Sequence, residues 1–584
     1  MKKIGIGYEN YKEFIDADMY YVDKTMLIRD VREKGGKVTL FTRPRRFGKT
    51  LALSMLRTFF ELEYDLDGNV VDKGRYFEGK HIMEAGGDVL SEMGKYPVIK
   101  LSLKSAKQPD FYSAFLKLRD EIIGEFSRHR YILDSEAITP GDKKKYQTYL
   151  SGWNRWFEIT ESIKDNDARE KEFRNEVELY STSLKLLSEA LQTYHGQKAV
   201  ILLDEYDVPL ENAYFSGFYN EMVGFIRSLF ESALKTNDAL EFAVITGCLR
   251  ISKESIFTGL NHLEINSIRG KNFSEAFGFT QDETEQMLMD YGLSDKLEEV
   301  QRWYDGYLFG EKEIYNPWSL IKYVSEHVAS HNALPEAYWA NTSSNIIIKD
   351  LVYQADENQK KELETLIAGG TIEKQIHEDI TYDDIHENED NLWNFLFFTG
   401  YMKKVSERFD GRNIFLKMCI PNIEIETIYA DQISSWFDRV KKKTDRSELY
   451  KGIRNKNGEA IGRFLTELLK KSISTFDSGE DFYQGFFLSL LFEMVDYDPR
   501  SNREHGIGRP DIVLYPQNPT DPAYLFEIKV RKKFNEMEDG IQEAFTQIDE
   551  RHYEDGILED GYAGVISYGV CFCKKSAIAR LKAE

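Results

Sequence analysis

The sequence predicts an α/β protein of several domains, and three observations carry this prediction. The chain has 584 residues, which is too many for one hydrophobic core. Apolar, strand-like segments alternate with helical segments in its first half, the pattern of a parallel sheet covered on both faces. Its end reads as helix, helix, strand, turn, strand, helix and strand. This order is typical of a small, separate α/β domain.

We expect three domains. The first is 1–279, with a helical insertion at about 106–195, the second is the mainly helical 280–440, and the third is 441–584. A basic run at 441–446 resembles a linker. The acidic run 373–391 reads as a solvated loop because it lacks the spacing of a calcium loop, and the aromatic segment that follows from Trp393 reads as a strand or a helix.

Charge and cysteine content restrict the class of protein. The formal net charge of −23 argues against a generally basic protein that coats DNA, although a local basic groove can lie within an acidic chain. Four cysteines in a chain of this length indicate a reducing compartment, and Cys571 and Cys573 read as part of a strand. We find no signal peptide and no apolar stretch of membrane-spanning length. We therefore expect a cytoplasmic protein that does not bind membranes.

A phosphate-binding loop is predicted between a strand at 37–42 and a helix from about 49 to 62. The segment RPRRFGKT occupies 43–50, where helix N–H groups can point at phosphates. Gly48, Lys49 and Thr50 match the end of the GxxxxGK[ST] motif, with Lys49 on the β- and γ-phosphates of ATP and Thr50 on Mg²⁺.

Arg43 and Arg46 need separate comment within this segment. Arg43 replaces the first glycine of the motif. Arg46 is a candidate nucleotide-binding residue. The alternative for Arg45 and Arg46, that they are solvated or bind a neighbouring acidic helix, stays open.

Two further strand ends complete the predicted nucleotide site. An apolar strand at 199–203 ends in Asp204 and Glu205. Asp204 is expected to hold Mg²⁺ and Glu205 to orient the attacking water. Another strand, 241–246, ends at Thr246, and Arg250 follows where sensor residues of such ATPases lie. The carboxyl ends of parallel strands meet at one edge, where such folds bind ligands.

A second constellation lies near the end of the chain. Pro510 and Asp511 are followed by Glu527 and Lys529 on a mostly apolar strand, the PD…(D/E)xK pattern. Residues two apart on a strand share a face. Asp511 and Glu527 offer oxygen ligands for Mg²⁺, and Lys529 can position water and stabilise charge on a scissile phosphate. The plain alternative is a strand cap and an ordinary surface ion pair.

Three other residues are assigned to this second site. Glu480 opens an apolar helix and is a further candidate acidic residue. Gln547 and Arg551 lie four apart on a predicted helix and so share a face, from which they can contact a phosphate backbone.

Taken with several other motifs, these residues are similar to a family of AAA-ATPase-like proteins with a C-terminal PD-(D/E)XK nuclease domain. The other motifs are YVDKT from Tyr21, WYDGYLFG from Trp303, YNPWS from Tyr315, TGYM from Thr399 and IPN from Ile420. The resemblance implies a P-loop ATPase core, a helical and winged-helix-like middle and a restriction-endonuclease-like C-terminal fold. It also implies that an arginine is usual at Arg43, and that Gln484 stands where the family has a histidine.

The expected function is ATP-regulated, Mg²⁺-dependent cleavage of DNA, with Mn²⁺ as another metal for the nuclease site. One alternative is a nucleotide-switched signalling or nucleic-acid-binding protein with little or no nuclease activity, and another is cleavage of RNA. A homo-oligomer or an unknown protein partner stays open. We expect the aromatic motifs to pack in cores or interfaces rather than to stack on bases, because stacking needs exposed rings beside a basic groove.

Overall fold

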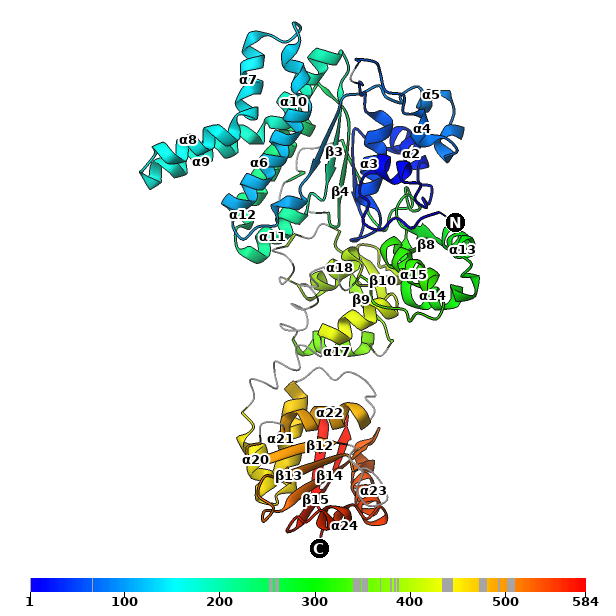
Figure 1. The fold of residues 1–584 in the computed structure, drawn as a ribbon, viewed down its shortest axis with the longest axis vertical. Helices are drawn as coiled ribbons and strands as arrows, with labels where there is room; N and C mark the ends of the chain where they lie inside the picture. Colours follow the sequence, from blue (N-terminus) through cyan, green and yellow to red (C-terminus); the bar gives the residue numbers. More distant parts are fainter. Residues whose placement is uncertain are drawn as a thin grey trace. The chain divides into compact units, whose positions relative to one another are not determined.

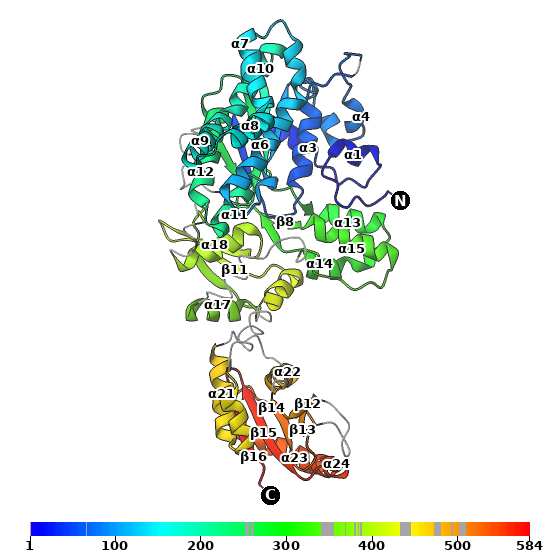
Figure 2. The ribbon, with the colours of Figure 1, turned by 60° about the vertical axis from the view of Figure 1, so that its left-hand side comes forward.

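The computed structural model forms two compact units, which are described separately here (Figures 1 and 2). Unit 1 comprises Met1–Ser344 and Glu373–Glu426, and unit 2 comprises Asn345–Ile372 and Thr427–Glu584. The structure describes residues 2–65, 67–250, 256–257, 262–339, 348, 356–367, 369–378, 381–382, 385, 388–432, 445–471, 480–491, 494–501 and 510–583.

A five-stranded parallel sheet forms the centre of unit 1, in the order β2-β3-β4-β1-β5. Its strands are β1 (Val38–Thr42), β2 (Val98–Ser102), β3 (Ala199–Asp204), β4 (Leu240–Gly247) and β5 (Leu263–Asn266). The first four lie where the apolar runs predict them, and every residue of β1 and β3 is buried. β5 was not predicted, because it is a short edge strand with only one fully buried residue.

Helices cover both faces of this sheet, as the alternating pattern predicts. Figure 1 shows α2 and α3 on one side and α6, α10 and α12 on the other. The helices of this part are α1 (Tyr11–Asp16), α2 (Met26–Lys34), α3 (Lys49–Phe60), α4 (Gly74–Phe77), α5 (Gly87–Leu90), α6 (Phe111–Arg128), α7 (Pro140–Leu150), α8 (Gly152–Ser162), α9 (Asn166–Ser181), α10 (Ser183–His195), α11 (Val208–Ser216) and α12 (Tyr219–Phe230). The run from α6 to α10 lies between β2 and β3 and forms the expected helical insertion.

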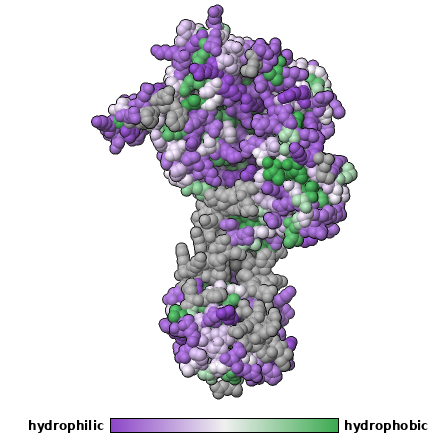
Figure 3. Space-filling model, viewed as in Figure 1, coloured by the Kyte–Doolittle hydropathy of each residue, from purple (hydrophilic) through white to green (hydrophobic). Residues whose placement is uncertain are grey.

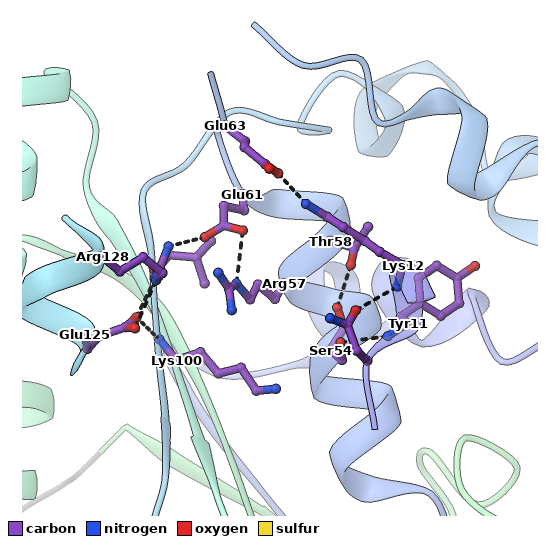
Figure 4. A network of polar contacts seen from close by, with 12 residues as sticks. Tyr11, Lys12, Ser54, Arg57, Thr58, Glu61, Glu63, Lys100, Glu125 and Arg128 are labelled. Atoms are coloured by element: carbon purple, nitrogen blue, oxygen red, sulfur yellow. Dashed lines mark hydrogen bonds and ion pairs between the residues drawn. The ribbon is translucent and has the colours of Figure 1, made fainter. Parts of the chain in front are cut away.

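A polar network ties the helix after the phosphate loop to the start of this insertion (Figure 4). Glu61, just after α3, accepts hydrogen bonds from Arg57 Nε at 3.0 Å and from Arg128 Nη1, on α6, at 2.5 Å. Glu125, also on α6, accepts the backbone N–H of Lys100 on β2 at 2.7 Å. Because these charged groups are partly buried and paired, they hold α3, α6 and the sheet in one arrangement.

The remainder of unit 1 combines helices with two small sheets. Helices α13 (Gln281–Asp290), α14 (Leu297–Tyr304) and α15 (Pro317–Ala329) pack with the sheet β6-β8-β7, and α18 (Glu389–Thr399) belongs to the part that carries the sheet β10-β11-β9. The strands are β6 (Phe279–Thr280), β7 (Tyr307–Phe309), β8 (Lys312–Tyr315), β9 (Ile372–Gln375), β10 (Lys403–Phe409) and β11 (Ile414–Cys419).

The expectation of a loop over the acidic run 373–391 is wrong in part. Its first residues continue β9, and its last residues open α18, which makes the Trp393 segment a helix. Alternate side chains of β9 are buried, and the buried Lys374 lies 3.3 Å from Asp390. The high charge of this run is therefore the reason why the short strand β9 was not predicted. Positions 379–380, 383–384 and 386–387 lie outside the described residues.

Unit 2 contains a five-stranded mixed sheet in the order β12-β13-β14-β15-β16, in which only β14 and β15 pair in parallel. Its strands are β12 (Tyr497–Ser501), β13 (Ile512–Pro516), β14 (Ala523–Val530), β15 (Val565–Cys573) and β16 (Ser576–Leu581), and its helices are α17 (Glu357–Ile367), α20 (Ser447–Arg454), α21 (Gly458–Lys471), α22 (Glu480–Leu491), α23 (Met537–Glu550) and α24 (Tyr553–Glu559). Cys571 and Cys573 lie on β15, as expected. Most of the predicted linker, 441–444, lies outside the described residues.

The α/β multidomain fold class is therefore confirmed, with a parallel N-terminal sheet, a largely helical middle and a mixed C-terminal sheet. The coloured part of the face in Figure 3 is mostly hydrophilic, with apolar residues that are partly scattered and partly gathered in small patches. Over the residues that the structure describes, we find no helix with both the length and the apolar character needed to cross a membrane.

Candidate nucleotide and nuclease sites

The predicted phosphate loop joins β1 to α3 at the carboxyl edge of the parallel sheet. Gly48 caps α3 with φ of 86°, a left-handed conformation that favours glycine. Lys49 and Thr50 are the first two residues of the helix. The first N–H groups of any helix have no intrahelical acceptor and suit an anion. The local fold is therefore a strand–turn–helix with a left-handed glycine before the helix, as the predicted phosphate loop requires.

The Lys49 side chain lies inside the loop and contacts its first residues. This side chain is 6% exposed, and Nζ donates to the carbonyl oxygens of Arg43 and Pro44, each at 2.8 Å. The ammonium group is thus fixed between the start of the loop and the helix that follows. This is the position from which it can contact a phosphate bound against the helix N-terminus.

Arg43, which replaces the first motif glycine, is a core residue. Its side chain is fully buried and donates to the carbonyl oxygens of Thr42 at 2.9 Å, Asn266 at 2.7 Å and Phe273 at 3.1 Å. The guanidinium carbon also lies over two phenylalanine rings, 5.1 Å from the centroid of Phe309 and 5.5 Å from that of Phe277. Burial lowers the pKa of Arg43 to about 9. Its side chain therefore joins the end of β5 to the loop.

The ends of β3 and β4 bring Asp204, Glu205 and Thr246 together. Thr246 Oγ1 donates to Asp204 Oδ1 at 2.5 Å and accepts the Glu205 N–H at 3.4 Å. Glu205 has φ of 52°, and burial raises the pKa of its carboxyl group. Thr246 is 1% exposed, so its hydroxyl orients the acidic strand end. Sequence reasoning assigned it to the nucleotide itself.

Asp207 belongs to the same strand end and was missed by sequence reasoning. Its carboxylate is 3% exposed, and Oδ2 accepts the backbone N–H groups of Cys248 at 2.6 Å and Leu249 at 3.1 Å. The DEYD segment is therefore built into the sheet edge, where a solvated turn was the alternative. The sequence did offer a signal for Asp207, because it is a second acidic residue only three positions after the end of the apolar strand.

Motifs from the middle of the chain pack directly on the phosphate loop. Phe47 is 1% exposed and meets the rings of Tyr307 and Phe309 with centroids 5.0 and 5.2 Å away. A Cβ on Gly400 would lie 2.8 Å from Pro44 Cβ, which is too close. The TGYM motif therefore needs a glycine at this position, where it packs against the loop. The predicted packing role of these aromatic motifs is confirmed.

The two loop arginines that follow Pro44 also have protein partners. Arg45 forms an ion pair with Glu211 on α11, the acidic-helix alternative that the sequence left open. The guanidinium of Arg46 lies over the Trp318 ring, 5.0 Å from its centroid. Arg46 also has a positive φ of 140°. The structure thus places both side chains against neighbouring helices.

Arg250 lies in an ion-pair cluster with the middle of the chain. Its Nη1 is 3.7 Å from Glu378 Oε2, and Glu378 also pairs with Arg269. Arg269 in turn lies 2.8 Å from Glu407 on β10. The predicted sensor position therefore connects the end of β4 to the β10-β11-β9 part of unit 1.

In unit 2, adjacent strands bring Asp511, Glu527 and Lys529 together. Asp511 immediately precedes β13, whose Ile512 pairs with Phe526 on β14. Asp511 Oδ2 accepts the Ile528 N–H at 2.7 Å, and Lys529 Nζ lies 3.0 Å from Glu527 Oε1. Glu527 is 0% and Lys529 4% exposed. The surface ion-pair alternative is therefore wrong, because this pair is buried.

One carboxylate oxygen of this site could bind a divalent cation. Among the described residues, Glu527 Oε2 is buried without a hydrogen-bond partner, and the Asp511 carboxylate lies near enough to affect its charge. Burial, and then the Asp511 charge, raise the pKa of Glu527 to about 7 against the opposing effect of Lys529. A buried carboxylate oxygen without a donor is costly. A hard cation with oxygen ligands would satisfy it.

The donor set that the structure shows is small. Within the described ranges, no cluster of three or more His, Cys, Asp or Glu side chains could hold a metal. Two carboxylates therefore remain, with the Ile528 carbonyl beside them, which accepts a hydrogen bond from Lys529 Nζ at 2.9 Å. Glu480 is the first residue of α22, and its side chain lies outside what the structure describes.

Two glutamines and a tyrosine surround this group. Gln484 Nε2 donates to the Asp511 carbonyl at 2.7 Å, so the residue at the family's histidine position supports the Asp511 backbone. Gln547 Nε2 donates to the Tyr553 hydroxyl at 3.4 Å. Burial raises the pKa of Tyr553, and the charges of Glu527 and Asp511 raise it further. The sequence did not predict a role for Tyr553. It lies six residues after Gln547, beyond the end of the helix that carries Gln547, so helical spacing could not relate the two residues.

Comparisons with known proteins match the two regions of the chain that contain these sites. The family described as "Predicted AAA-ATPase" matches residues 5–257, and the PD-(D/E)XK nuclease superfamily matches residues 478–580. Among curated proteins, the chain is similar to "Uncharacterized protein in vnfD 5'region" of Azotobacter chroococcum mcd 1, at 25% identity over 357 residues, 60% of this chain and 56% of that protein. The chain thus spans little more than half of that relative. No solved structure matches. The two family matches confirm the recognised architecture, in which an AAA-ATPase-like region precedes a region similar to PD-(D/E)XK nucleases.

Proposed function

We propose that this protein binds ATP and uses its C-terminal region to cleave phosphodiester bonds of nucleic acid, DNA in the first instance, with a divalent metal. The observation that carries the proposal is the buried group of Asp511, Glu527 and Lys529 with one unsatisfied carboxylate oxygen. Such an arrangement lowers stability unless it is used. Together with the match to a nuclease superfamily, it favours a hydrolytic site over a structural ion pair.

Each residue of this group has a distinct proposed role. Asp511 and Glu527 would hold Mg²⁺ or Mn²⁺, which supplies neutralisation of charge on the scissile phosphate when bound. The Lys529 ammonium group is held by the Ile528 carbonyl and by Glu527, so it can position a water and donate to a phosphate oxygen. Gln484 holds the Asp511 backbone, and Gln547 orients Tyr553 beside the acidic pair.

At the N-terminal site, Lys49 and Gly48 would bind the ATP phosphates. Thr50 and Asp204 would hold the accompanying Mg²⁺, and Glu205 would orient the attacking water. Thr246 acts through Asp204 and Glu205, both of which its hydroxyl contacts. We keep the domain division at 279 and 440 as part of this proposal.

Regulation by ATP is supported by the packing of the phosphate loop. Pro44, Arg46 and Phe47 all lie against the middle of the chain, and Arg250 pairs with Glu378 there. A phosphate that moves this loop must also move these contacts, because tightly packed interfaces respond as discrete arrangements. We propose that this change is passed on to the nuclease site.

The test is cleavage of supercoiled plasmid by the full chain in Mg²⁺ or Mn²⁺, with and without ATP. Lys529→Ala and Asp511→Ala should each reduce cleavage at least about a thousandfold, since such groups act at the transition state. EDTA should abolish it. The matched control is Lys451→Ala, an exposed lysine on α20 that pairs with Glu448. Cleavage that survives both site variants would refute the proposal, and binding without cleavage would favour a nucleotide-switched binding protein.

A further inference from the structure

Asp207 lies at the N-terminus of α11 without capping that helix. An aspartate at this position ordinarily accepts an N–H group of the first helical turn, but the Asp207 side chain makes no such hydrogen bond to α11, all of which the structure describes. Its Oδ2 atom instead accepts the N–H groups of Cys248 and Leu249, at 2.6 and 3.1 Å. Its Oδ1 atom has no hydrogen-bond partner among the described residues. Both hydrogen bonds of this buried carboxylate therefore go to the turn at 247–249, which ends β4.

Tyr206, next to Asp207, binds the same turn. Its hydroxyl group donates to the Leu249 carbonyl oxygen at 2.6 Å. Its ring lies so close to the turn that a Cβ on Gly247 would be 2.5 Å from a ring carbon, and the same Cβ would be 3.0 Å from Asp207 Oδ1. Only glycine leaves room for these two side chains. The end of the acidic segment and the turn therefore form one tightly packed unit.

The turn also contacts the phosphate loop, at the first and seventh residues of RPRRFGKT. The Gly247 carbonyl oxygen accepts the Arg43 N–H at 3.0 Å. Cys248 Sγ lies 3.6 Å from Lys49 Nζ, close enough to accept a weak hydrogen bond. A displacement of the turn would therefore move both the start of the loop and the lysine.

The contact between Lys49 and Cys248 suits a lysine that binds phosphate. An ammonium group has three N–H donors, and Lys49 directs two of them at backbone carbonyl oxygens of the loop. The third is left for the thiol, which is a weak acceptor. Burial raises the pKa of Cys248 to about 11, so the thiol is neutral and does not cancel the Lys49 charge. The thiol therefore orients the lysine, and a phosphate oxygen can take its place.

We propose that Asp207 is a positioning residue of the nucleotide site. Its carboxylate fixes the turn at 247–249, and this turn holds Arg43 and Lys49 where the loop binds phosphates. The inference rests on the proposed function, because the position of Lys49 matters only if this lysine binds ATP. Asp207 acts through Lys49 and is not itself a phosphate ligand.

Affinity for Mg-ATP, measured with the full chain by competition against a fluorescent ATP analogue, tests this role. The variants are Asp207→Ala, which removes the acceptor, and Asp207→Asn, which keeps an oxygen that can accept both N–H groups. The matched control is Asn237→Ala. Asn237 is 8% exposed, and its Oδ1 accepts the Ala239 N–H at 3.0 Å. It therefore fixes the backbone at the other end of β4.

We expect Asp207→Ala to weaken ATP binding about tenfold, because two N–H groups of the turn lose their acceptor. Asp207→Asn should bind within about threefold of the wild type, and Asn237→Ala within about twofold. In a Lys49→Ala background, Asp207→Ala should weaken binding by less than about threefold, because the main group that it positions is absent. A merely structural role of Asp207 would not depend on Lys49.

Tyr206→Phe provides a milder change of the same turn if Asp207→Ala does not fold. It removes the hydroxyl group that binds Leu249 and keeps the buried ring. ATP affinity should fall about threefold in this variant, and this loss too should disappear in the Lys49→Ala background.

Two results would overturn the positioning role and leave the nucleotide site standing. The first is an ATP affinity that falls in Lys49→Ala but not in Asp207→Ala or Tyr206→Phe. The second is a loss in Asp207→Ala that Asn237→Ala equals, or that persists in full without Lys49. If Lys49→Ala itself binds ATP like the wild type, the proposed nucleotide site is wrong and the role of Asp207 is wrong with it.

Discussion

The two candidate sites of this chain each contain a buried lysine and acidic side chains, but these charged groups have different hydrogen-bond partners at the two sites. At the nucleotide site, Lys49 donates to two backbone carbonyl oxygens and Asp204 accepts the Thr246 hydroxyl. At the nuclease site, the lysine pairs with Glu527, and the other oxygen of that carboxylate has no partner among the described residues. The first site holds its charged groups with protein atoms. The second leaves one buried carboxylate oxygen without a hydrogen-bond partner among the described residues, where we propose that a divalent cation binds.

The largest effect that would sharpen this comparison is on nucleotide binding. Lys49→Ala should reduce the affinity for Mg-ATP at least about a hundredfold, because it removes the cation that we propose contacts the phosphates. Isothermal titration calorimetry measures this directly. Lys37→Ala is the matched control, since Lys37 Nζ also donates to a carbonyl oxygen, that of Leu240 at 2.6 Å, but at the opposite end of β1. Equal ATP affinity of Lys49→Ala and wild type would show that the loop does not bind phosphates.

A second prediction concerns the arginine that departs from the glycine motif. Arg43→Gly restores the usual glycine, yet it should lower the free energy of unfolding by about 3 kcal/mol or more, because three buried carbonyl oxygens lose their donor and a cavity opens. Arg43→Lys should be intermediate, since an ammonium group cannot reproduce the planar fork. Chemical denaturation of the full chain measures both changes. An Arg43→Gly protein as stable as the wild type would contradict the assigned core role.

This residue also illustrates what the sequence could and could not predict. Asp204 was predictable because it ends a short apolar run, and parallel strands place such ends at one edge of the sheet. Asp511 was predictable because it opens a short apolar strand, which pairs antiparallel with the strand that carries Glu527 and Lys529. The burial of Arg43 was not predictable, since two of its three acceptors lie more than 200 residues away in the sequence. The partners of Asp207 and Tyr553 also come from other elements, which are Cys248 and Leu249 for Asp207 and Gln547 for Tyr553. The strand β9 was hidden by charge that tertiary pairing neutralises.

A third prediction compares two buried glutamates. Glu424 is 0% exposed like Glu527, but its oxygens accept hydrogen bonds from Ser319 Oγ at 2.8 and 2.9 Å and from the Trp339 N–H at 2.8 Å. Burial, opposed by these hydrogen bonds, raises the pKa of Glu424 from 4.5 to about 7. The folded protein therefore favours the neutral acid. This contribution to stability is present below about pH 4.5 and is lost as the pH rises to 7.

Glu424→Gln keeps an acceptor and removes the charge. The difference in unfolding free energy between this variant and wild type should therefore shift in favour of the variant by roughly 3 kcal/mol between pH 4.5 and 8. Denaturation at a series of pH values tests this. The control is Glu448→Gln, an exposed glutamate that pairs with Lys451, which should show no such trend. A pH-independent difference for Glu424→Gln would mean that Glu424 stays ionised in the folded protein.

Binding of Mn²⁺ to the nucleotide-free chain tests most directly whether the nuclease site needs a cation. Electron paramagnetic resonance titration should show one site that disappears in Asp511→Asn and in Glu527→Gln, while Lys49→Ala and Glu424→Gln retain it. Mn²⁺ binding that is unchanged in both site variants, or undetectable in the wild type, would contradict the account.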